Sequence, residues 1–364
     1  MTDDRTVPHE TIAAMVRRIQ PTWTVQDATP ASDGHHDVYH LDVETGVTEP
    51  TTEAGRTRAV LKATPSENSP TCDDEARLLA ILDAHTSLPV PRVRGVVDED
   101  PDLPAPFFLS PTLPGANCSR TGLSGFSESS LRVLARSTGR HLARLHELDA
   151  VDAYGFVGVD ATETLDGTRP SADLDQLSVP EPTESWPDYL AAESDRVLTA
   201  LDGTRFADRR PELGAVLDAR IDALSGGFEP VVARIDQSLD NVLLDPETGA
   251  VTGLLDWEFC LAATPAYDLA FVEHSLAGGH WRLLPGVPDY REPIRSGMLE
   301  GYREVGSPHV VEQFHENREC YALLAALHSM VNFEDWFDQV AADVPARERE
   351  AAAEALGEAV ERRC

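Results

Sequence analysis

The first part of the chain alternates hydrophobic and polar positions in the pattern of β-strands. Runs rich in β-branched and aromatic residues, each bounded by turn residues, predict five strands: residues 22–28, 38–43, 59–63, 92–97 and 107–112. Between the third and fourth runs, residues 73–82 place acidic side chains in a first turn and leucine and isoleucine at helical spacing, which predicts an amphipathic helix. We therefore expect an antiparallel sheet of five strands with one helix over residues 1–112.

From about residue 127 onward the apolar positions follow a helical period instead. Leucines recur on one face of a helix, at Leu131, Leu134, Leu142, Leu145 and Leu148. One short strand pair interrupts this pattern at 242–244 and 253–255, around a turn sequence. Residues 113–364 are therefore expected to be mainly helical, and the chain as a whole to have an α+β fold with two domains.

The charge of the chain is strongly acidic and excludes whole classes of partner. Its 364 residues include 63 Asp plus Glu and 30 Lys plus Arg, a formal net charge of −33. A chain without a basic stripe repels polyanions, so we expect neither nucleic acid nor a membrane as a partner. The acidic residues are spread over the whole sequence, which is typical of salt-adapted proteins and predicts a halophilic source.

The cysteines and the longest apolar segments indicate a cytoplasmic protein. Five single cysteines form neither a CxxC pair nor an even framework, which favours reduced thiols. The N-terminus lacks the basic and then apolar order of a signal peptide. No apolar run approaches the roughly 20 residues that a membrane span requires.

Lysine occurs once in the chain, at Lys62, although the basic residues number 30. Arginine carries a planar fork of donors, whereas lysine carries a compact charge on a flexible stem. A position that keeps lysine where every other basic residue is arginine indicates a need for that compact charge. Chance survival of one lysine is the alternative.

Three oxygen-bearing side chains border the expected strand pair. Asp236 and Asn241 precede it, and Asp256 follows it. Such oxygen ligands suit Mg²⁺, which proteins hold through one or two groups together with substrate phosphates. Phosphoryl transfer also needs a lysine on the phosphates and an acid that fixes this lysine, which Lys62 and Glu75 supply.

Six short motifs occur in the order typical of aminoglycoside phosphotransferases, the small-molecule branch of the protein-kinase-like fold. They are Val60-Leu61-Lys62 around the third-strand lysine, Asp74-Glu75-Ala76 around its helix partner, Leu88-Pro89-Val90-Pro91 before the fourth strand, the hinge from Phe107 to Gly115, Leu142-Ala143-Arg144-Leu145-His146, and Tyr267-Asp268-Leu269-Ala270. Together they span nearly the whole chain, which therefore resembles a member of this family.

The resemblance implies a protein-kinase-like two-lobed fold, with a small antiparallel-sheet N-lobe over 1–112 and a mainly helical C-lobe over 113–364 that holds the acceptor pocket. It also implies transfer of the γ-phosphate of ATP or GTP to a hydroxyl of a small molecule, such as an aminoglycoside, choline, homoserine or a sugar. The residues that would contact the nucleotide are Lys62, its partner Glu75, Ser110 and Thr112 of the hinge, and Gly34 of the phosphate-covering turn.

The same resemblance assigns the catalytic and metal-binding roles. Asp236 would orient the attacking hydroxyl, and Asn241 and Asp256 would hold Mg²⁺. Where the family has His-Gly-Asp, this chain has Arg234-Ile235-Asp236. The alternative function is therefore a nucleotide-binding pseudokinase or regulator without turnover. A protein kinase is disfavoured because Trp-Glu, and not Phe-Gly, follows Asp256.

Several other polar residues complete the set of candidates. Glu258 is expected either to lie near a second metal position or to have a solvated or bracing role. Asp268 is expected to cap a helix or to brace a loop. His141 and His146 are five residues apart on a helix, which favours structural roles. Candidates for the acceptor pocket are Glu273, His274, Trp281, Glu334, Asp335 and Trp336.

Overall fold

The structure of the protein is a computed structural model that describes residues 7–31, 37–46, 55–64, 72–117, 122–161 and 163–364. The chain forms two compact units. The first consists of Met1–Pro114, Gly158–Ser178 and Gly253–Glu258, and the second of Gly115–Val157, Val179–Thr252 and Phe259–Cys364. Each unit combines segments that are distant in the sequence, and the predicted lobe boundary between residues 112 and 113 stays a prediction.

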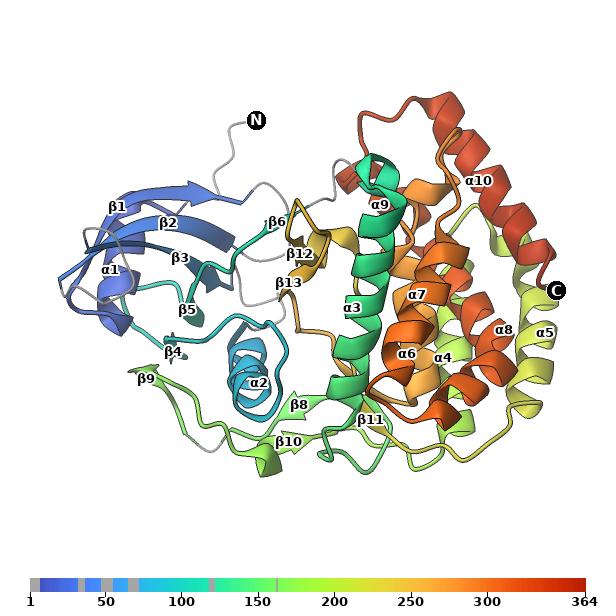
Figure 1. The fold of residues 1–364 in the computed structure, drawn as a ribbon, viewed down its shortest axis with the longest axis horizontal. Helices are drawn as coiled ribbons and strands as arrows, with labels where there is room; N and C mark the ends of the chain where they lie inside the picture. The colour runs from blue at the N-terminus through green and yellow to red at the C-terminus, as the bar shows by residue number, and fades with distance from the viewer. Residues whose placement is uncertain (1–6, 32–36, 47–54, 65–71, 118–121, 162) are drawn as a thin grey trace. The chain divides into compact units, whose positions relative to one another are not determined.

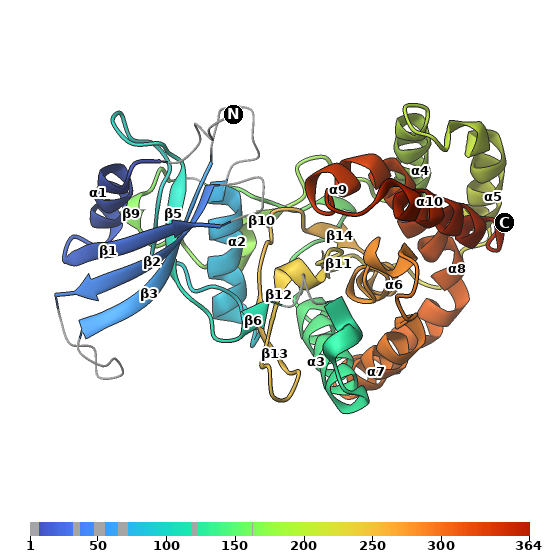
Figure 2. The same ribbon diagram turned by 90° about the horizontal axis from the view of Figure 1, so that it is seen from above.

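The first unit is built on an antiparallel sheet of six strands in the order β1-β2-β3-β5-β4-β9 (Figure 1). The strands are β1 (Trp23–Pro30), β2 (Asp37–Thr45), β3 (Arg56–Ala63), β4 (Gly95–Val97), β5 (Phe107–Pro111) and β9 (Asp166–Thr168). Two helices, α1 (His9–Ile19) and α2 (Cys72–His85), lie on opposite faces of the sheet (Figure 2). A two-stranded sheet of β8 (Gly158–Val159) and β10 (Leu177–Ser178) belongs to the same unit.

Among the described residues, this sheet has one strand more than the five that the sequence predicts, and the unit has one α-helix more. The sixth strand, β9, is three residues long and contains Gly167, so it offers no alternating pattern to detect. The missed helix α1 does carry a signal, because Ile12, Met15, Val16 and Ile19 recur at helical spacing and are all buried. The five predicted strands and the helix at 73–82 are confirmed as β1 to β5 and α2.

Alternation along β3 sorts its side chains between the two faces of the sheet. Leu61 is fully buried in a core cluster that it shares with Met15 and Val16 of α1. Successive side chains of a strand point to opposite faces, so the neighbouring Lys62 projects to the side that α2 covers. The strand thereby separates the hydrophobic core from the charged candidate site.

The second unit is mainly helical, as predicted. Its α-helices are α3 (Glu128–His146), α4 (Trp186–Leu201), α5 (Arg210–Asp222), α6 (Pro265–Leu276), α7 (Arg291–Arg303), α8 (Pro308–Val331), α9 (Phe333–Gln339) and α10 (Ala346–Glu361). Two small sheets, β11-β14-β7 and β13-β12-β6, accompany them. Their strands are β6 (Ala116–Asn117), β7 (Gly155–Phe156), β11 (Val231–Ala233), β12 (Val242–Leu244), β13 (Val251–Leu254) and β14 (Leu261–Ala263). Within the described residues, no helix is long and apolar enough to span a membrane.

The predicted strand pair is confirmed as β12 and β13, with β13 beginning two residues earlier than expected. The sequence analysis missed the other short strands because two or three residues cannot show a period of two. Two of them matter for the site. β11 leads directly into residues 234–241, and β14 follows residues 256–258 in the chain.

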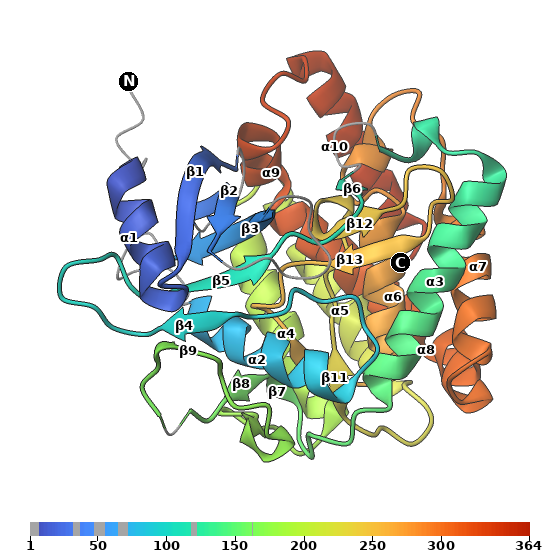
Figure 3. The same ribbon diagram turned by 60° about the vertical axis from the view of Figure 1, so that its left-hand side comes forward.

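Helices α3 and α7 pack side by side at a glycine-lined crossing (Figure 3). Gly139 of α3 lies against the backbone of Met298, and Gly301 of α7 lies against the backbone of Arg136. A side chain at either position would collide with the opposite helix. This close approach fixes α3, which carries His146 at its C-terminal end.

Candidate active site

The only lysine of the chain lies in a pocket of carboxylates in the first unit. Lys62 Nζ on β3 is 2.6 Å from Glu75 Oε2 on α2. The other oxygen of Glu75, Oε1, accepts a hydrogen bond of 3.1 Å from the backbone N–H of Trp257. Glu75 is 96% buried, so the helix residue fixes the lysine and the segment 256–258 at the same time.

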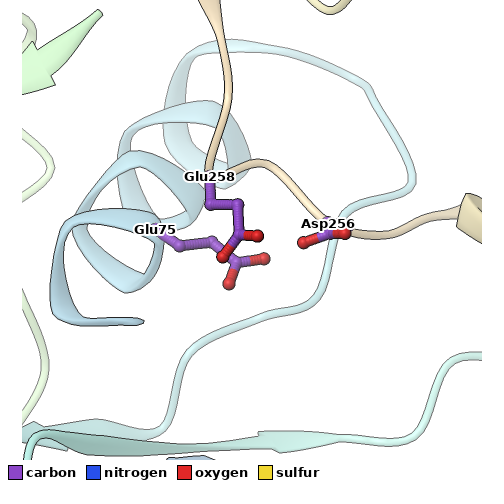
Figure 4. Close-up of side chains that lie close together, drawn as sticks. All are labelled: Glu75, Asp256 and Glu258. Atoms are coloured by element: carbon purple, nitrogen blue, oxygen red, sulfur yellow. The ribbon is translucent and has the colours of Figure 1, made fainter. Parts of the chain in front are cut away.

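Asp256 and Glu258 complete this carboxylate cluster (Figure 4). Lys62 Nζ is 3.2 Å from Asp256 Oδ1 and 3.8 Å from Glu258 Oε2. One oxygen from each of Glu75, Asp256 and Glu258 lies within 4.8 Å of the others. Three carboxylates around one ammonium leave an excess of negative charge, and this all-oxygen donor set fits a hard divalent cation such as Mg²⁺.

The members of the cluster differ in their access to solvent. The side chain of Asp256 is 39% exposed, whereas that of Glu258 is 6% exposed. Asp256 is therefore the carboxylate of the cluster that is most accessible to solvent. Glu258 is placed to brace Lys62 from the buried side of the cluster. The structure therefore brings Glu258 to the candidate site, where the sequence analysis had left its role undecided.

The charge of Lys62 is held by its neighbours. Burial alone would lower the pKa of its ammonium group, but the negative charges of Glu75, Asp256 and Glu258 outweigh burial and raise the pKa above its ordinary value. Lys62 consequently stays protonated over the whole physiological range. A fixed positive charge in this position suits the binding of phosphate oxygens.

Asp256 occupies a backbone conformation with positive φ, at 60°. Aspartate is one of the few residues other than glycine that tolerate the left-handed region. The next residue holds the segment in place, because the buried Trp257 donates its indole N–H to the backbone oxygen of Leu254 at 3.0 Å. Trp257 anchors the segment, a role that nothing in the sequence pattern indicated.

The predicted catalytic loop, residues 234–241, lies in the second unit. Asp236 accepts two hydrogen bonds, from the backbone N–H of Ser238 at 3.0 Å and from Asn241 Nδ2 at 3.1 Å. The loop therefore brings together Asp236 and Asn241, the residues predicted to orient the hydroxyl and to bind the metal ion. Asp236 is exposed and its carboxylate can accept a further hydrogen bond.

A strained turn at Ile235 directs the loop. The backbone N–H of Asp236 donates to the oxygen of Arg234 at 2.7 Å, across Ile235 with a φ of 55°. This two-residue hydrogen bond around a positive φ is the pattern of a γ-turn, which is rare and strained. A β-branched residue in this region is an outlier, so other contacts must hold the turn.

Asp268 of α6 supplies those contacts. Its fully buried carboxylate accepts hydrogen bonds from the backbone N–H of Ile235 at 2.7 Å and of Arg234 at 3.1 Å. It also accepts from His146 Nε2 at 2.8 Å, and His146 Nδ1 lies 3.0 Å from the hydroxyl of Tyr302. The structure thus confirms the expected bracing role of Asp268 and the structural role of His146. It adds Tyr302, which the sequence did not single out.

Arg234 stands where the resembling family has histidine, and its side chain is used inside the loop. The residue is 97% buried, and its Nη2 donates to the backbone oxygen of Asn241 at 3.2 Å. Arg234 therefore connects the beginning of the loop with its end. The arginine side chain is long enough to reach Asn241, and its guanidinium group carries the N–H donor that this hydrogen bond requires.

The remaining predicted site residues are distributed as follows. Ser110 is buried on β5 opposite Val60 of β3, and Thr112 donates its backbone N–H to Arg58 at 3.2 Å. Both lie at the end of β5, where the resemblance places the hinge, and their contact with a nucleotide stays a prediction. Gly34 lies outside the described residues.

The acceptor-pocket candidates separate into engaged and accessible residues. Glu273 and His274 are engaged inside the second unit, with Arg295 and with Ser329 respectively. Trp281 and Trp336 are half-buried and pack edge to face, with ring centroids 4.8 Å apart. Trp336 also stacks on the ring of His280, with ring centroids 4.9 Å apart, and the exposed Glu334 and Asp335 precede it on α9.

Comparison with known sequences gives two matches. A sequence model described as the phosphotransferase enzyme family matches residues 27–305. The mouse (Mus musculus) protein "Acyl-CoA dehydrogenase family member 10" is 26% identical over 246 residues, which make up 66% of this chain. The chain spans about a fifth (19%) of the length of that relative.

Solved structures of antibiotic phosphotransferases share the fold. The macrolide 2'-phosphotransferase MphH from Brachybacterium faecium is 19% identical, with a TM-score of 0.53 over 95% of this chain and 98% of its own. The aminoglycoside phosphotransferase APH(4)-Ia, in a ternary complex with ADP and hygromycin B, is 14% identical, with a TM-score of 0.58 over 95% and 98%. APH(2")-IIia, in complex with GDP and kanamycin, is 12% identical, with a TM-score of 0.55 over 97% of each chain. The predicted protein-kinase-like α+β fold is therefore confirmed.

Proposed function

Because the chain belongs to the phosphotransferase enzyme family, we propose that it moves the γ-phosphate of ATP or GTP, bound with Mg²⁺, to a hydroxyl of a small molecule. The observation that carries this proposal is Lys62, the only lysine, at 2.6 Å from the buried carboxylate of Glu75. Kinase-like enzymes use such a lysine and acid pair to hold the nucleotide phosphates. A structural ion pair alone would not require a lysine in a chain that otherwise uses arginine.

In this proposal the first unit binds the nucleotide. Lys62 holds phosphate oxygens and Glu75 fixes the lysine, while Ser110, Thr112 and Gly34 contact the nucleotide. Asp256 and Asn241 are the proposed ligands of Mg²⁺. When bound, the ion neutralises charge on the phosphates and positions the γ-phosphate for transfer.

Asp236 acts on the acceptor. One carboxylate oxygen accepts the proton of the attacking hydroxyl as the new oxygen–phosphorus bond forms and the bond between the γ-phosphorus and the bridging oxygen breaks. The hydrogen bonds from Ser238 and Asn241 hold the carboxylate in place. Positioning of the hydroxyl and stabilisation of charge, and not covalent chemistry by the protein, then supply the rate.

The alternative is a nucleotide-binding pseudokinase, motivated by Arg234 and Ile235 in place of His-Gly. The geometry of the loop favours turnover instead. Asp236 is exposed and oriented, Asn241 is in contact with it, and Arg234 supports the backbone of Asn241. A protein that had lost phosphotransfer would have no need to keep this arrangement.

The proposed acceptor is a small molecule with a free hydroxyl, of the aminoglycoside, choline, homoserine or sugar type. The solved relatives are named for a macrolide or are bound to hygromycin B or kanamycin. The half-buried pair Trp281 and Trp336 would offer aromatic side chains to such a molecule. Neither nucleic acid nor a membrane is an expected partner, and a cytoplasmic location stays a prediction.

The first experiment measures thermal unfolding in molar KCl with ATP or GTP, in the presence and absence of Mg²⁺. Nucleotide at 100 times its dissociation constant should raise the free energy of unfolding by about 2.7 kcal/mol. Lys62→Ala and Asp256→Ala should abolish the Mg²⁺-dependent shift. The matched control is Arg58→Ala, which removes an exposed cation from the same strand. The nucleotide site is refuted if no shift occurs, or if Arg58→Ala loses the shift as well.

Turnover is tested by a screen of hydroxyl acceptors with nucleotide labelled on the γ-phosphate. Asp236→Asn should retain the nucleotide-dependent shift but lower transfer by about 10²- to 10⁴-fold, since it removes the group that accepts the proton. Nucleotide binding without transfer to any acceptor, in the native chain, would favour the pseudokinase. Label on protein and none on small molecules would favour a protein kinase.

A further inference from the structure

The loop 234–241 has a second attachment to α6, on the opposite side of Asp236 from the contacts with Asp268. The backbone N–H of Gln237 donates a hydrogen bond to Ser275 Oγ at 3.2 Å. Ser275 follows Asp268 by seven residues on α6, which is about two helical turns, so both side chains lie on the same face of the helix. This face of α6 therefore holds the residues before Asp236 through a carboxylate and the residue after it through a hydroxyl.

Every backbone N–H from residue 234 to residue 238 has an acceptor. Arg234 and Ile235 donate to Asp268, Asp236 donates to the oxygen of Arg234, Gln237 donates to Ser275, and Ser238 donates to the carboxylate of Asp236. Only two of these acceptors, Asp268 and Ser275, lie outside the loop. Together they enclose the strained turn at Ile235 and the exposed Asp236 that follows it.

The side chain of Gln237 extends this attachment to α3. It is fully buried, although the preceding Asp236 is exposed. Gln237 Nε2 donates to Oγ1 of Thr138, a fully buried residue of α3, at 2.9 Å. Ser275 is itself fixed, because its hydroxyl donates to the backbone oxygen of Phe271 at 3.1 Å. The residue after Asp236 is thus held by two helices.

A strained backbone conformation persists only where the surrounding structure over-determines it. With a φ of 55°, Ile235 would relax if the chain after it could move, and the carboxylate of Asp236 would then change its orientation. Asp268 holds the chain up to the N–H of Ile235. The first N–H after the turn that is held from outside the loop is that of Gln237. Ser275 therefore supplies the attachment that the turn requires at its far end.

We propose that Ser275 and Gln237 are positioning residues, which maintain the strained turn and so hold the carboxylate of Asp236 in the orientation for phosphoryl transfer. Both act through the backbone of the loop and not on the reacting atoms. The kinetic part of this inference rests on the proposed function. The attachment of the loop does not, so it can be tested separately.

The kinetic test compares Ser275→Ala with Ser296→Ala, at an exposed serine of α7. Ser275→Ala leaves the N–H of Gln237 without its acceptor and should lower kcat about tenfold. The KM for nucleotide should stay unchanged, because the ion pair of Lys62 with Glu75 is not altered. Ser296→Ala should have the kcat and KM of the native chain.

A second pair of variants separates positioning from stability. Gln237→Met keeps most of the side-chain volume and removes Gln237 Oε1, a buried atom without a hydrogen-bond partner among the described residues. It should unfold in urea near the native midpoint and yet lose about tenfold in kcat. The matched control is Gln313→Met, at a buried glutamine of α8 that donates to the backbone oxygen of Gly227 at 2.6 Å. This control should unfold at a lower urea concentration and keep the native kcat.

The strain in the turn gives a test that a merely structural role would not pass. Glycine adopts a positive φ without steric cost, so Ile235→Gly should make the attachment at Ser275 less necessary. In the Ile235→Gly background, Ser275→Ala should lower kcat only about threefold, instead of about tenfold. Equal losses in the two backgrounds would show that Ser275 does not act by holding the turn.

Amide hydrogen exchange tests the attachment without any turnover. In Ser275→Ala, the N–H groups of Gln237 and Ile235 should exchange at least about tenfold faster than in the native chain, whereas α10 should keep its native rates. If the native chain transfers phosphate to no acceptor, the proposed function fails, and this measurement still decides whether Ser275 holds the loop. Native exchange rates over residues 234–238 in Ser275→Ala would overturn the inference. In an active native chain, an unchanged kcat in both Ser275→Ala and Gln237→Met would overturn it as well.

Discussion

The pocket around Lys62 and the loop 234–241 hold their functional groups by different forces. In the pocket, opposite charges hold the lysine against Glu75, Asp256 and Glu258. In the loop, backbone N–H groups donate to Asp268 and fix the turn that presents Asp236. Any residue except proline supplies a backbone N–H, so a loop held in this way tolerates changed side chains.

This difference explains where the chain departs from the family pattern. The pocket depends on the identity of its side chains, and it has the lysine and the acid that the resemblance requires. The loop has Arg234-Ile235 where the family has His-Gly, yet both residues still donate their backbone N–H to Asp268. The departures therefore change the side chains inside the loop, while the backbone hydrogen bonds to Asp268 remain.

Among the substitutions that test this comparison, removal of the buried carboxylate of Asp268 should have the largest effect on stability. Asp268→Ala leaves two backbone N–H groups and His146 without their acceptor, and each buried unsatisfied group costs about 1–3 kcal/mol. We expect the free energy of unfolding to fall by about 4 kcal/mol in a urea titration. Asp335→Ala, at an exposed acid of α9, is the matched control. Equal stability of the two variants would contradict the bracing role.

Acid should weaken the second unit through His141, which precedes His146 on α3. Burial, followed by the charges of Arg144, Arg234 and Arg140, lowers the pKa of His141 to about 4. The unfolded chain, with a pKa near 6.5, binds the proton first, so stability is lost as the pH falls from about 6.5 to about 4. The expected contribution is about 3 kcal/mol.

The measurement is the unfolding free energy of the native chain and of His141→Gln across this pH range. The variant cannot take up the proton. Its free energy of unfolding should therefore fall less between pH 6.5 and pH 4 than that of the native chain, and the difference should equal the expected contribution of His141. His309→Gln, at an exposed histidine of α8, should follow the native profile. Parallel profiles for the native chain and His141→Gln would show that another group senses the acid.

Substitution of Arg234 tests whether the departure from histidine is functional. Arg234→Met removes the hydrogen bond to the backbone of Asn241 and keeps most of the side-chain volume. A hydrogen bond from a charged group contributes about 1.5 kcal/mol, so we expect the Mg²⁺ concentration for half-maximal activity to rise about tenfold. Mg²⁺-dependent thermal stabilisation in the presence of nucleotide should weaken in parallel.

Arg234→Lys keeps the charge but not the planar fork and should recover only part of this loss. Arg347→Met serves as the surface control. A fall in turnover with unchanged Mg²⁺ dependence would assign Arg234 a purely structural role. The comparison with Asp256→Ala, which removes a proposed metal ligand directly, separates an effect on the loop from an effect on the carboxylate cluster.

The sequence predicted the pocket better than the loop, for a physical reason. Lys62 and Glu75 are long-range partners, but each carries a local signal: a unique lysine on a strand and an acid in the first turn of a helix. The six-stranded sheet was underestimated by one strand because β9 is too short to show alternation. The helix α1 had a readable pattern of buried positions and was missed.

The contacts of the loop could not be read from the sequence. Asp268 was expected to brace a loop, but the pairing of its oxygens with the backbone of Arg234 and Ile235 depends on the packing of α6 against β11. The role of Trp257 as an anchor and the contact of His146 with Tyr302 also arise from packing.

The smallest expected effect, at Ile235, tests the strain in the turn. At a φ of 55° a residue with a Cβ pays about 1–2 kcal/mol that glycine does not. Ile235→Gly should therefore be more stable to urea than Ile235→Ala by about 1 kcal/mol, although glycine is normally the less stable of the two in ordered structure. The same pair of substitutions at Val133, an exposed position within α3, should give the normal order. If alanine is the more stable residue at both positions, the turn stores no strain, and the hydrogen bonds to Asp268 merely accompany a relaxed backbone. The reversed order at Ile235 would instead show that these bonds hold a conformation that the residue itself opposes.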